Sequence, residues 1–387
     1  MYEMMNNLTD RQTDRQTDRR NYGIDLLRII AMLGVVINHL IMQGGVLHAS
    51  TDSGKTAIIW LVEIVAYLSV DCYILISGYV NYSDTYKGYK FNRIVDLWFQ
   101  VVFWGIFLYL PSFLGLHNTC QVSDFVKTIF PITFNTYWFF TAYFALWFVM
   151  PALNSLCSKV KVGQAKEIVV VMLIVFSGYA TLTSPVGDVF GLSGGFSFLW
   201  FCMLYVIGAL IRKYKIFVYK TGKLLTVMTV GIAITWFCVC FLGKVTKLIF
   251  GKEIGELLLV SYNSPTILLA SICLVAWFSK MELRKGKKLI RYWSSATFGV
   301  YIIHMHPWIK NYILLNNFTF INNASAWLIP IELVGCGLLI TVICLVLDKG
   351  REYLFKMLKI DGIEKKINNV LNVGINLLGK IKIDENK

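Results

Sequence analysis

Long apolar stretches alternate with short polar segments along almost the whole chain. Ten such stretches occur, at residues 24–42, 57–78, 94–114, 136–156, 168–183, 196–211, 224–243, 264–279, 294–314 and 327–347. An α-helix needs about 20 mostly apolar residues to cross a hydrocarbon core of roughly 30 Å. The pattern therefore predicts an all-α, polytopic membrane protein with about ten transmembrane helices, covering residues 22–347.

The two ends of the chain are polar. Residues 1–21 contain a repeated TDRQ unit and few apolar residues, which predicts a disordered, low-complexity tail. In residues 348–387, apolar and Lys positions alternate at helix-like spacing. This basic tail is expected to be either an amphipathic helix that lies on membrane lipid at the inner leaflet, or a poorly ordered segment.

Composition and charge support a membrane location. The chain is 56% hydrophobic and only 16% charged, which is too apolar for a typical soluble protein. Its net charge of +14 could indicate a nucleic-acid partner, but most Lys and Arg residues lie in the two tails and in the loops on the same side as the tails. By the positive-inside rule, this distribution predicts a cell-membrane protein with both termini cytoplasmic and no nucleic-acid partner.

The first predicted helix carries a polar stripe. Its sequence GIDLLRIIAMLGVVINHL contains Asp25, Arg28 and His39. At about 100° per residue, Arg28 and His39 lie within roughly 20° of one face and about 16 Å apart along the axis. Ionisable residues inside a membrane helix indicate function. The alternative is structural: Asp25 and Arg28 form a surface i, i+3 pair, and His39 is a buried histidine with satisfied hydrogen bonds.

Glu63 and Asp71 lie in the second predicted helix. With alternating helix directions, Glu63 reaches a depth similar to that of His39. We hypothesise that one of the two carboxylates orients His39, because a carboxylate bonded to one imidazole nitrogen fixes the tautomer and makes the other nitrogen a better general base. The alternative is that each carboxylate pairs with another polar side chain between helices.

Two further features concern later spans. The ninth span contains FGVYIIHMHPWI, with His304 and His306. On a helix, residues i and i+2 point roughly 200° apart and cannot share an ion, so no metal site is predicted. Tyr301 and His304 do share a face. In the sixth span, Gly208 is expected to permit close contact with another helix.

Several of these strings resemble one known family. An Arg followed by ten residues and a His in the first helix, preceded by GIDxLR, resembles the integral-membrane acyltransferases called the acyltransferase 3 family. The strings VDCYILISGYV, TYWFFTAYFALWFVMPALN and FLWFCMLYVIGALIRKY are also similar to family patterns. The resemblance covers about residues 22–345. It implies transfer of an acyl group, most often acetyl, from cytoplasmic acyl-CoA to a hydroxyl of a bacterial cell-surface polysaccharide or its lipid-linked glycan precursor.

The resemblance also implies roles for individual residues. His39 is expected to be the catalytic base, with Glu63 or Asp71 beside it. Arg28 is expected to hold phosphates of the donor, together with Lys90 and Arg93. The family has an RxxR pair where this chain has Lys90 and Arg93, and a Lys lacks the bidentate fork of an Arg.

Similar YxIH strings occur late in family members, which makes Tyr301 and His304 candidates for lining the substrate pocket. No cofactor other than the acyl-CoA donor is expected.

A transporter or flippase of glycan precursors is the alternative function. Its buried Asp, Glu and His residues would form a proton relay or a sugar path. The sequence shows no inverted repeat and no matching pair of broken segments, which speaks against this alternative. A membrane glycan polymerase would usually need a longer loop than any between the predicted spans.

Overall fold

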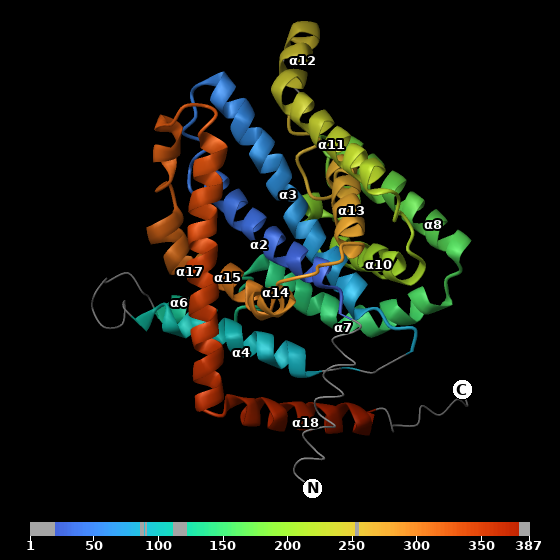
Figure 1. Ribbon diagram of the computed structural model, residues 1–387, viewed down its shortest axis with the longest axis vertical. Coiled ribbons are helices and arrows are strands. Elements are labelled where there is room, and N and C mark those ends of the chain that lie inside the picture. Colours follow the sequence, from blue (N-terminus) through green and yellow to red (C-terminus); the bar gives the residue numbers. More distant parts are fainter. Residues whose placement is uncertain (1–19, 86–88, 90, 111–121, 252–254, 379–387) are drawn as a thin grey trace.

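The protein is built from helices packed against one another (Figure 1). The computed structural model describes residues 20–85, 89, 91–110, 122–251 and 255–378, and contains no strand within these residues. The predicted all-α fold class is therefore confirmed. The predicted tail of residues 1–21 falls almost entirely outside the described residues.

The helices follow one another with short connections. The first half of the chain forms α2 (Tyr22–Met42), α3 (Ser53–Asn81), α4 (Phe91–Phe107), α6 (Val122–Ile129), α7 (Trp138–Lys159), α8 (Val162–Val171), the π-helical η1 (Met172–Tyr179) and α9 (Ala180–Thr183). The second half forms η2 (Ser193–Gly195), α10 (Phe198–Tyr214), α11 (Thr221–Phe237), η3 (Cys238–Leu242), α12 (Gly243–Phe250), α13 (Pro265–Ser279), α14 (Lys287–Ser294), α15 (Thr297–His304), α16 (Pro307–Ile309), η4 (Lys310–Leu314), η5 (Thr319–Asn323), α17 (Ile329–Met357) and α18 (Ile360–Leu378).

The first two long helices begin at residues that cap them. The side chain of Asn21 accepts a hydrogen bond from the backbone N–H of Ile24 at the start of α2. Asp52 does the same for Lys55 at the start of α3. Each cap satisfies one of the N–H groups that a helix leaves unpaired in its first turn. The helices therefore begin where the polar connections end.

α3 and α10 approach each other closely at two glycines. A Cβ at Gly208 would lie 2.1 Å from the carbonyl oxygen of Leu75, and one at Gly78 would lie 2.1 Å from that of Tyr205. Each glycine thus leaves room for the backbone of the facing helix. The prediction that Gly208 permits close helix contact is confirmed.

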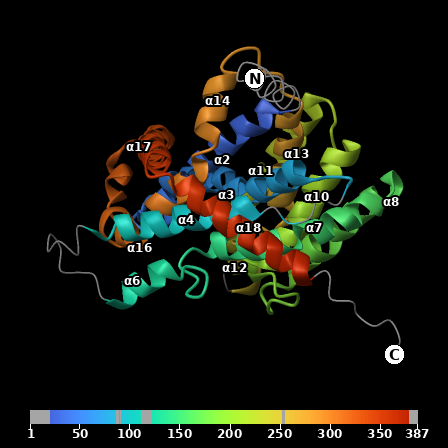
Figure 2. The ribbon, with the colours of Figure 1, turned by 90° about the horizontal axis from the view of Figure 1, so that it is seen from below.

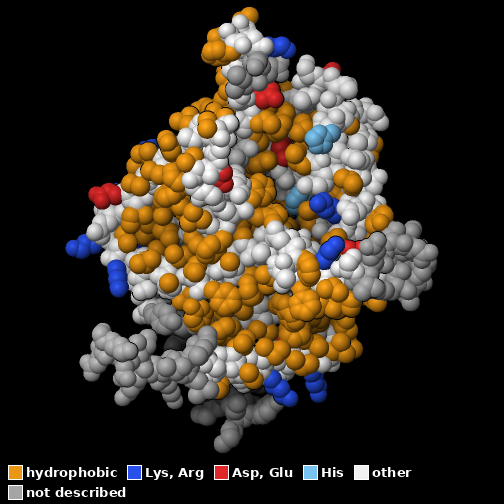
Figure 3. Space-filling model, turned by 180° about the vertical axis from the view of Figure 1, so that it is seen from behind, with side chains coloured by type: hydrophobic (Ala, Val, Ile, Leu, Met, Phe, Trp, Pro, Cys, Tyr) orange, Lys and Arg blue, Asp and Glu red, His pale blue; other side chains and the backbone are white. Residues whose placement is uncertain are grey.

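In the part of the chain that the structure describes, six helical segments are long and apolar enough to cross a membrane. They are Tyr22–Met42, Ser53–Asn81, Trp138–Lys159, Val162–Thr183, Thr221–Phe250 and Ile329–Met357, and α13 is a shorter apolar helix. Hydrophobic side chains cover wide areas of the face shown in Figure 3, whereas Lys and Arg side chains lie mainly near its edges. These features support a membrane protein. The count of ten spans and the cytoplasmic placement of both termini stay predictions.

The predicted ninth span is not one helix. α15 ends at His304, and α16 begins at Pro307 with His306 as its N-cap. Proline lacks an N–H and disfavours helical geometry in the residue before it, and His306 accordingly has an extended backbone with φ −53° and ψ 134°. The helix is thus interrupted within the predicted span at residues 294–314, and the span itself stays a prediction.

The C-terminal part is more ordered than a tail. α17 runs through the predicted boundary at residue 347 and continues to Met357, with Asp348 completely buried. α18 then turns away from α17 and packs along α4 (Figures 1 and 2). α18 is helical from Ile360 to Leu378. Its contact with membrane lipid stays a prediction.

Candidate active site

Two adjacent pockets lie along α2. The larger one, which we call the basic pocket, has a volume of about 450 Å³. The smaller one, which we call the inner pocket, has a volume of about 30 Å³ and is lined by His39. Both pockets are lined by Tyr73, Phe139 and Phe298, so these three side chains lie at the junction where the two pockets adjoin.

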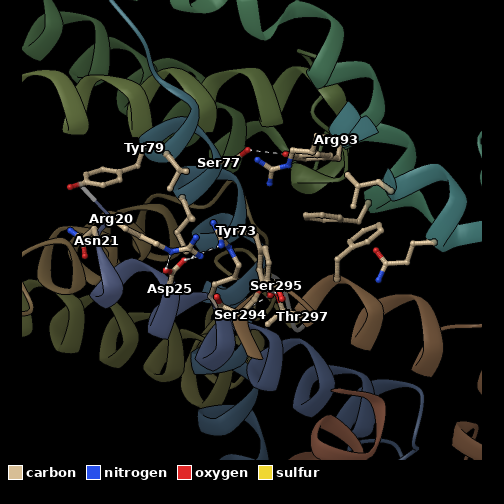
Figure 4. A pocket seen from close by; sticks show the side chains of 18 of the residues that line it. Arg20, Asn21, Asp25, Tyr73, Ser77, Tyr79, Arg93, Ser294, Ser295 and Thr297 are labelled. Carbon is tan, nitrogen blue, oxygen red and sulfur yellow. Dashed lines mark hydrogen bonds and ion pairs between the residues drawn. The ribbon is translucent and has the colours of Figure 1, made fainter. Parts of the chain in front are cut away.

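A group of ion-paired side chains lines the basic pocket at the start of α2. Asp25 accepts from Arg20 through Nε at 2.5 Å and from Arg28 through Nη1 at 3.2 Å. In Figure 4, the Arg20–Asp25 pair lies on one side of the pocket and Arg93 on the other, with Tyr73 between them. The i, i+3 pair of Asp25 and Arg28 expected from the structural alternative is thus present. One carboxylate faces two guanidinium groups, so the group keeps a net positive charge.

Two more arginines reach the basic pocket from other helices. Arg93, at the start of α4, donates to the side chain of Asn81 at 3.1 Å. Arg212, near the end of α10, donates to the Tyr79 hydroxyl at 3.3 Å, and its guanidinium lies 5.1 Å from the centre of the Tyr79 ring. Lys90 lies outside the described residues. The pocket therefore gathers cations from three helices.

Arg20 and Arg212 were not predicted as site residues. Arg212 lies in the string ALIRKY at the end of a predicted span, where basic residues normally mark membrane topology. The sequence signal that distinguishes it is its place inside a string already recognised as similar to the family pattern.

Tyr73 fixes the junction of the two pockets. Its hydroxyl donates to the backbone carbonyl of Arg28 at 2.8 Å. Its ring meets the ring of Phe139 edge to face, with centroids 6.2 Å apart. Aromatic rings therefore lie where the two pockets adjoin, and one of them is anchored to α2 by its hydroxyl.

His39 is hydrogen-bonded to another histidine. Its Nδ1 lies 2.9 Å from Nε2 of His304, and Nδ1 of His304 lies 2.5 Å from the carbonyl oxygen of Val300. A carbonyl only accepts, so Nδ1 of His304 must carry the proton, and Nε2 of the neutral ring is then an acceptor. It follows that His39 donates through Nδ1. The lone pair on Nε2 of His39 is left available as a base.

The two carboxylates of α3 contact other groups. Glu63 accepts from the side-chain amide of Asn38 at 2.7 Å, and Asp71 accepts from the indole N–H of Trp200 at 3.1 Å. Among the described residues, the second oxygen of each carboxylate has no hydrogen-bond partner. The hypothesis that Glu63 or Asp71 orients His39 is therefore wrong, because α3 aims Glu63 at Asn38, which lies about 100° around α2 from His39.

Two side chains of the ninth predicted span, Tyr301 and His304, lie near His39. Tyr301 lines the inner pocket, and its ring centroid lies 6.2 Å from that of His304. His304 is buried behind His39 and is not part of the pocket lining. His306 lies elsewhere, where Nε2 donates to the Gly105 carbonyl at 3.2 Å. No group of three potential metal ligands occurs within the part of the chain that the structure describes.

Comparison with known proteins identifies one domain. Residues 21–349 match the model of a family described as an acyltransferase domain. This range contains every residue that lines either pocket except Arg20. No curated protein and no solved structure matches the chain.

Proposed function

The chain belongs to the acyltransferase 3 family, and from this premise we propose that it transfers an acetyl group from cytoplasmic acyl-CoA to a hydroxyl of a cell-surface polysaccharide or its lipid-linked glycan precursor. The family match supports acyl transfer and gives no support to the transporter alternative. The donor, the acetyl group and the glycan acceptor are the parts of this statement that we propose.

The position of the inner pocket directly beside the basic pocket is the observation that carries the proposal. An acyl-CoA has an anionic nucleotide at one end and a thioester at the other, joined by a long, narrow arm. The basic pocket offers a cationic chamber of about 450 Å³, and the inner pocket offers a small chamber beside an imidazole. The three shared aromatic side chains border the route by which the arm would pass.

The basic pocket supplies groups suited to the donor's diphosphate. Guanidinium groups bind phosphate oxygens through parallel, charge-assisted hydrogen bonds. Arg28 and Arg93 are placed in this role, and we extend it to Arg212 on the strength of its position in the same pocket. Lys90 remains a proposed contributor from the sequence. The axial separation of about 16 Å between Arg28 and His39 is comparable to the length of the pantetheine arm.

His39 is placed as the general base. Its Nε2 takes the proton of the acceptor hydroxyl while the hydroxyl oxygen attacks the thioester carbonyl carbon. The carbon–sulfur bond then breaks, and the departing thiolate of CoA takes the proton back from His39. The products are an O-acetyl ester and CoA. His304 acts through His39 as a positioning residue, and Tyr301 contacts the reactants in the inner pocket.

This function fits a multi-pass protein of the cell membrane. We propose that the basic pocket opens to the cytoplasm, where acyl-CoA is found, and that the acceptor reaches the inner pocket from the opposite side. The N-terminal end of α2 lies at the basic pocket, in agreement with a cytoplasmic N-terminus.

The test is transfer of label from radiolabelled acetyl-CoA to a crude lipid-linked glycan extract by purified protein reconstituted into vesicles. The native protein is expected to label the glycan, and His39→Ala and Arg28→Ala are expected to abolish labelling without loss of folded protein. His48→Ala, at an exposed histidine, is the matched control and should retain activity. Full labelling by His39→Ala would remove the proposed base, and no labelling by the native protein would contradict the proposed reaction.

A further inference from the structure

A second cationic recess opens beside the basic pocket. It has a volume of about 750 Å³ and lies between the start of α2, the end of α10 and the connection from α13 to α14. We call it the basic annex. The annex and the basic pocket share Arg20, Asn21, Tyr79 and Arg212 in their linings. The two spaces therefore adjoin at these four side chains.

The lining of the annex is strongly unbalanced in charge. Its only acidic residue among the described lining is Glu282. Its cationic residues are Arg20, Arg212, Lys215, Lys280, Arg284 and Lys287. A recess lined by one sign of charge focuses the electrostatic potential and attracts an ion of the opposite sign. The annex is thus suited to a group with more than one negative charge.

Within the described residues, most of these cations have no anionic partner. Among the described residues, only Arg20 of the six forms an ion pair, and it does so with Asp25. Lys280 donates to the backbone carbonyl of Tyr219 at 2.8 Å, and the ammonium of Lys287 lies 5.6 Å from the centre of the Tyr22 ring. These contacts position the side chains but leave their charges uncompensated.

A third recess adjoins the basic pocket and has a different character. It has a volume of about 360 Å³ and shares Val80, Arg93 and Tyr143 with the basic pocket. Apart from Arg93, its described lining consists of uncharged side chains, many of them aromatic rings and amides. Of the two recesses that border the basic pocket, the annex is therefore the one built for an anion.

We propose that the basic annex binds the ribose 3′-phosphate of the donor, while the basic pocket holds the diphosphate. This inference rests on the proposed function, in which the donor is acyl-CoA. A phosphate monoester carries close to two negative charges and several acceptor oxygens, and several separate cations can contact it at once. Arg284 and Lys287 then determine whether the protein distinguishes CoA from its 3′-dephospho form.

The test compares two ligands that differ only in this phosphate. Binding of CoA and of 3′-dephospho-CoA to the purified full-length protein is measured by calorimetry, so that no acceptor is needed. The test variant is Arg284→Gln with Lys287→Gln. The matched control is Lys159→Gln with Lys166→Gln, which also removes two positive charges but lies at exposed positions outside the annex.

The native protein is expected to bind CoA about tenfold more tightly than 3′-dephospho-CoA, a size typical for charge-assisted contacts that are partly exposed to solvent. The test variant should bind CoA about tenfold more weakly and 3′-dephospho-CoA unchanged. The control variant should keep the native preference.

Other outcomes overturn the inference in distinguishable ways. Equal binding of the two ligands by the native protein, or an equal loss for both in the test variant, would show that the annex does not contact the 3′-phosphate. In a second experiment, acetyl transfer is measured in vesicles of phosphatidylcholine with and without phosphatidylglycerol. If the test variant binds both ligands as the native protein does, and loses only the effect of phosphatidylglycerol on its transfer rate, the annex binds a lipid headgroup and the proposal is refuted. Failure of the native protein to bind either ligand would refute the proposed donor as well.

Discussion

Replacing His304 tests the hydrogen-bond chain that we derive for the candidate active site. His304→Phe keeps a ring of similar size but removes the acceptor for the Nδ1 proton of His39, which lies 2.9 Å from it in the native protein. The tautomer of His39 with the proton on Nδ1 is then no longer stabilised by a hydrogen bond. The tautomer with the proton on Nε2, which cannot act as a base through that nitrogen, becomes populated.

The size of the effect follows from the burial of the pair. His39 and His304 are 9% and 3% exposed, so water does not readily replace the lost acceptor. Leaving a buried donor unpaired costs about 1–3 kcal/mol. At about 1.4 kcal/mol for each factor of ten, this predicts a fall in kcat of about 5-fold to 150-fold. The KM for acetyl-CoA should not change, because the basic pocket is untouched.

His304→Gln is the variant that separates tautomer control from packing. Its side-chain oxygen can accept from Nδ1 of His39, so most of the activity should return. The assay is labelled acetyl transfer by reconstituted protein, with thermal unfolding measured for both variants. Full activity of His304→Phe would refute the chain of reasoning. Equal loss in two well-folded variants, with no recovery in His304→Gln, would refute it as well.

Three further predictions follow from packing and from buried charge. Gly208→Ala places a Cβ 2.1 Å from the Leu75 carbonyl oxygen and should destabilise the protein by about 1–3 kcal/mol in thermal unfolding. Gly163→Ala is the control and should not destabilise it, because a Cβ there would have nothing within 4 Å. Equal stability of the two variants would contradict the close approach of α3 and α10. Asp348→Ala removes a buried carboxylate that binds three side chains and should cost about 3–5 kcal/mol in denaturant unfolding, and a loss below 1 kcal/mol would argue against this. Glu63→Gln keeps an acceptor oxygen for the side-chain amide of Asn38, so kcat and its pH profile in the transfer assay should be unchanged. A shifted pH profile would show that the Glu63 carboxylate takes part in catalysis.

Properties that depend on local patterns could be predicted from the sequence alone. Apolar runs of sufficient length predict membrane helices because the length and hydrophobicity of one segment decide whether it can cross the hydrocarbon core, independently of the neighbouring helices. The strings around Arg28 and His39 were sufficient to identify the family. The spacing of these two residues also predicted that they lie on one face of the first helix. Both properties belong to a single helix, so no tertiary information was needed.

Which polar groups contact one another depends on how the helices pack, and could not be predicted from the sequence. His39 and His304 are 265 positions apart, and nothing in either local pattern states that α15 brings its last residue against α2. Glu63 was a reasonable partner by depth, but the rotation of α3 about its axis decides the contact, and it selects Asn38. Depth in a membrane can be read from the distance along the chain. Rotation and pairing are set by side-chain packing between helices, and therefore appear only when the helices are assembled.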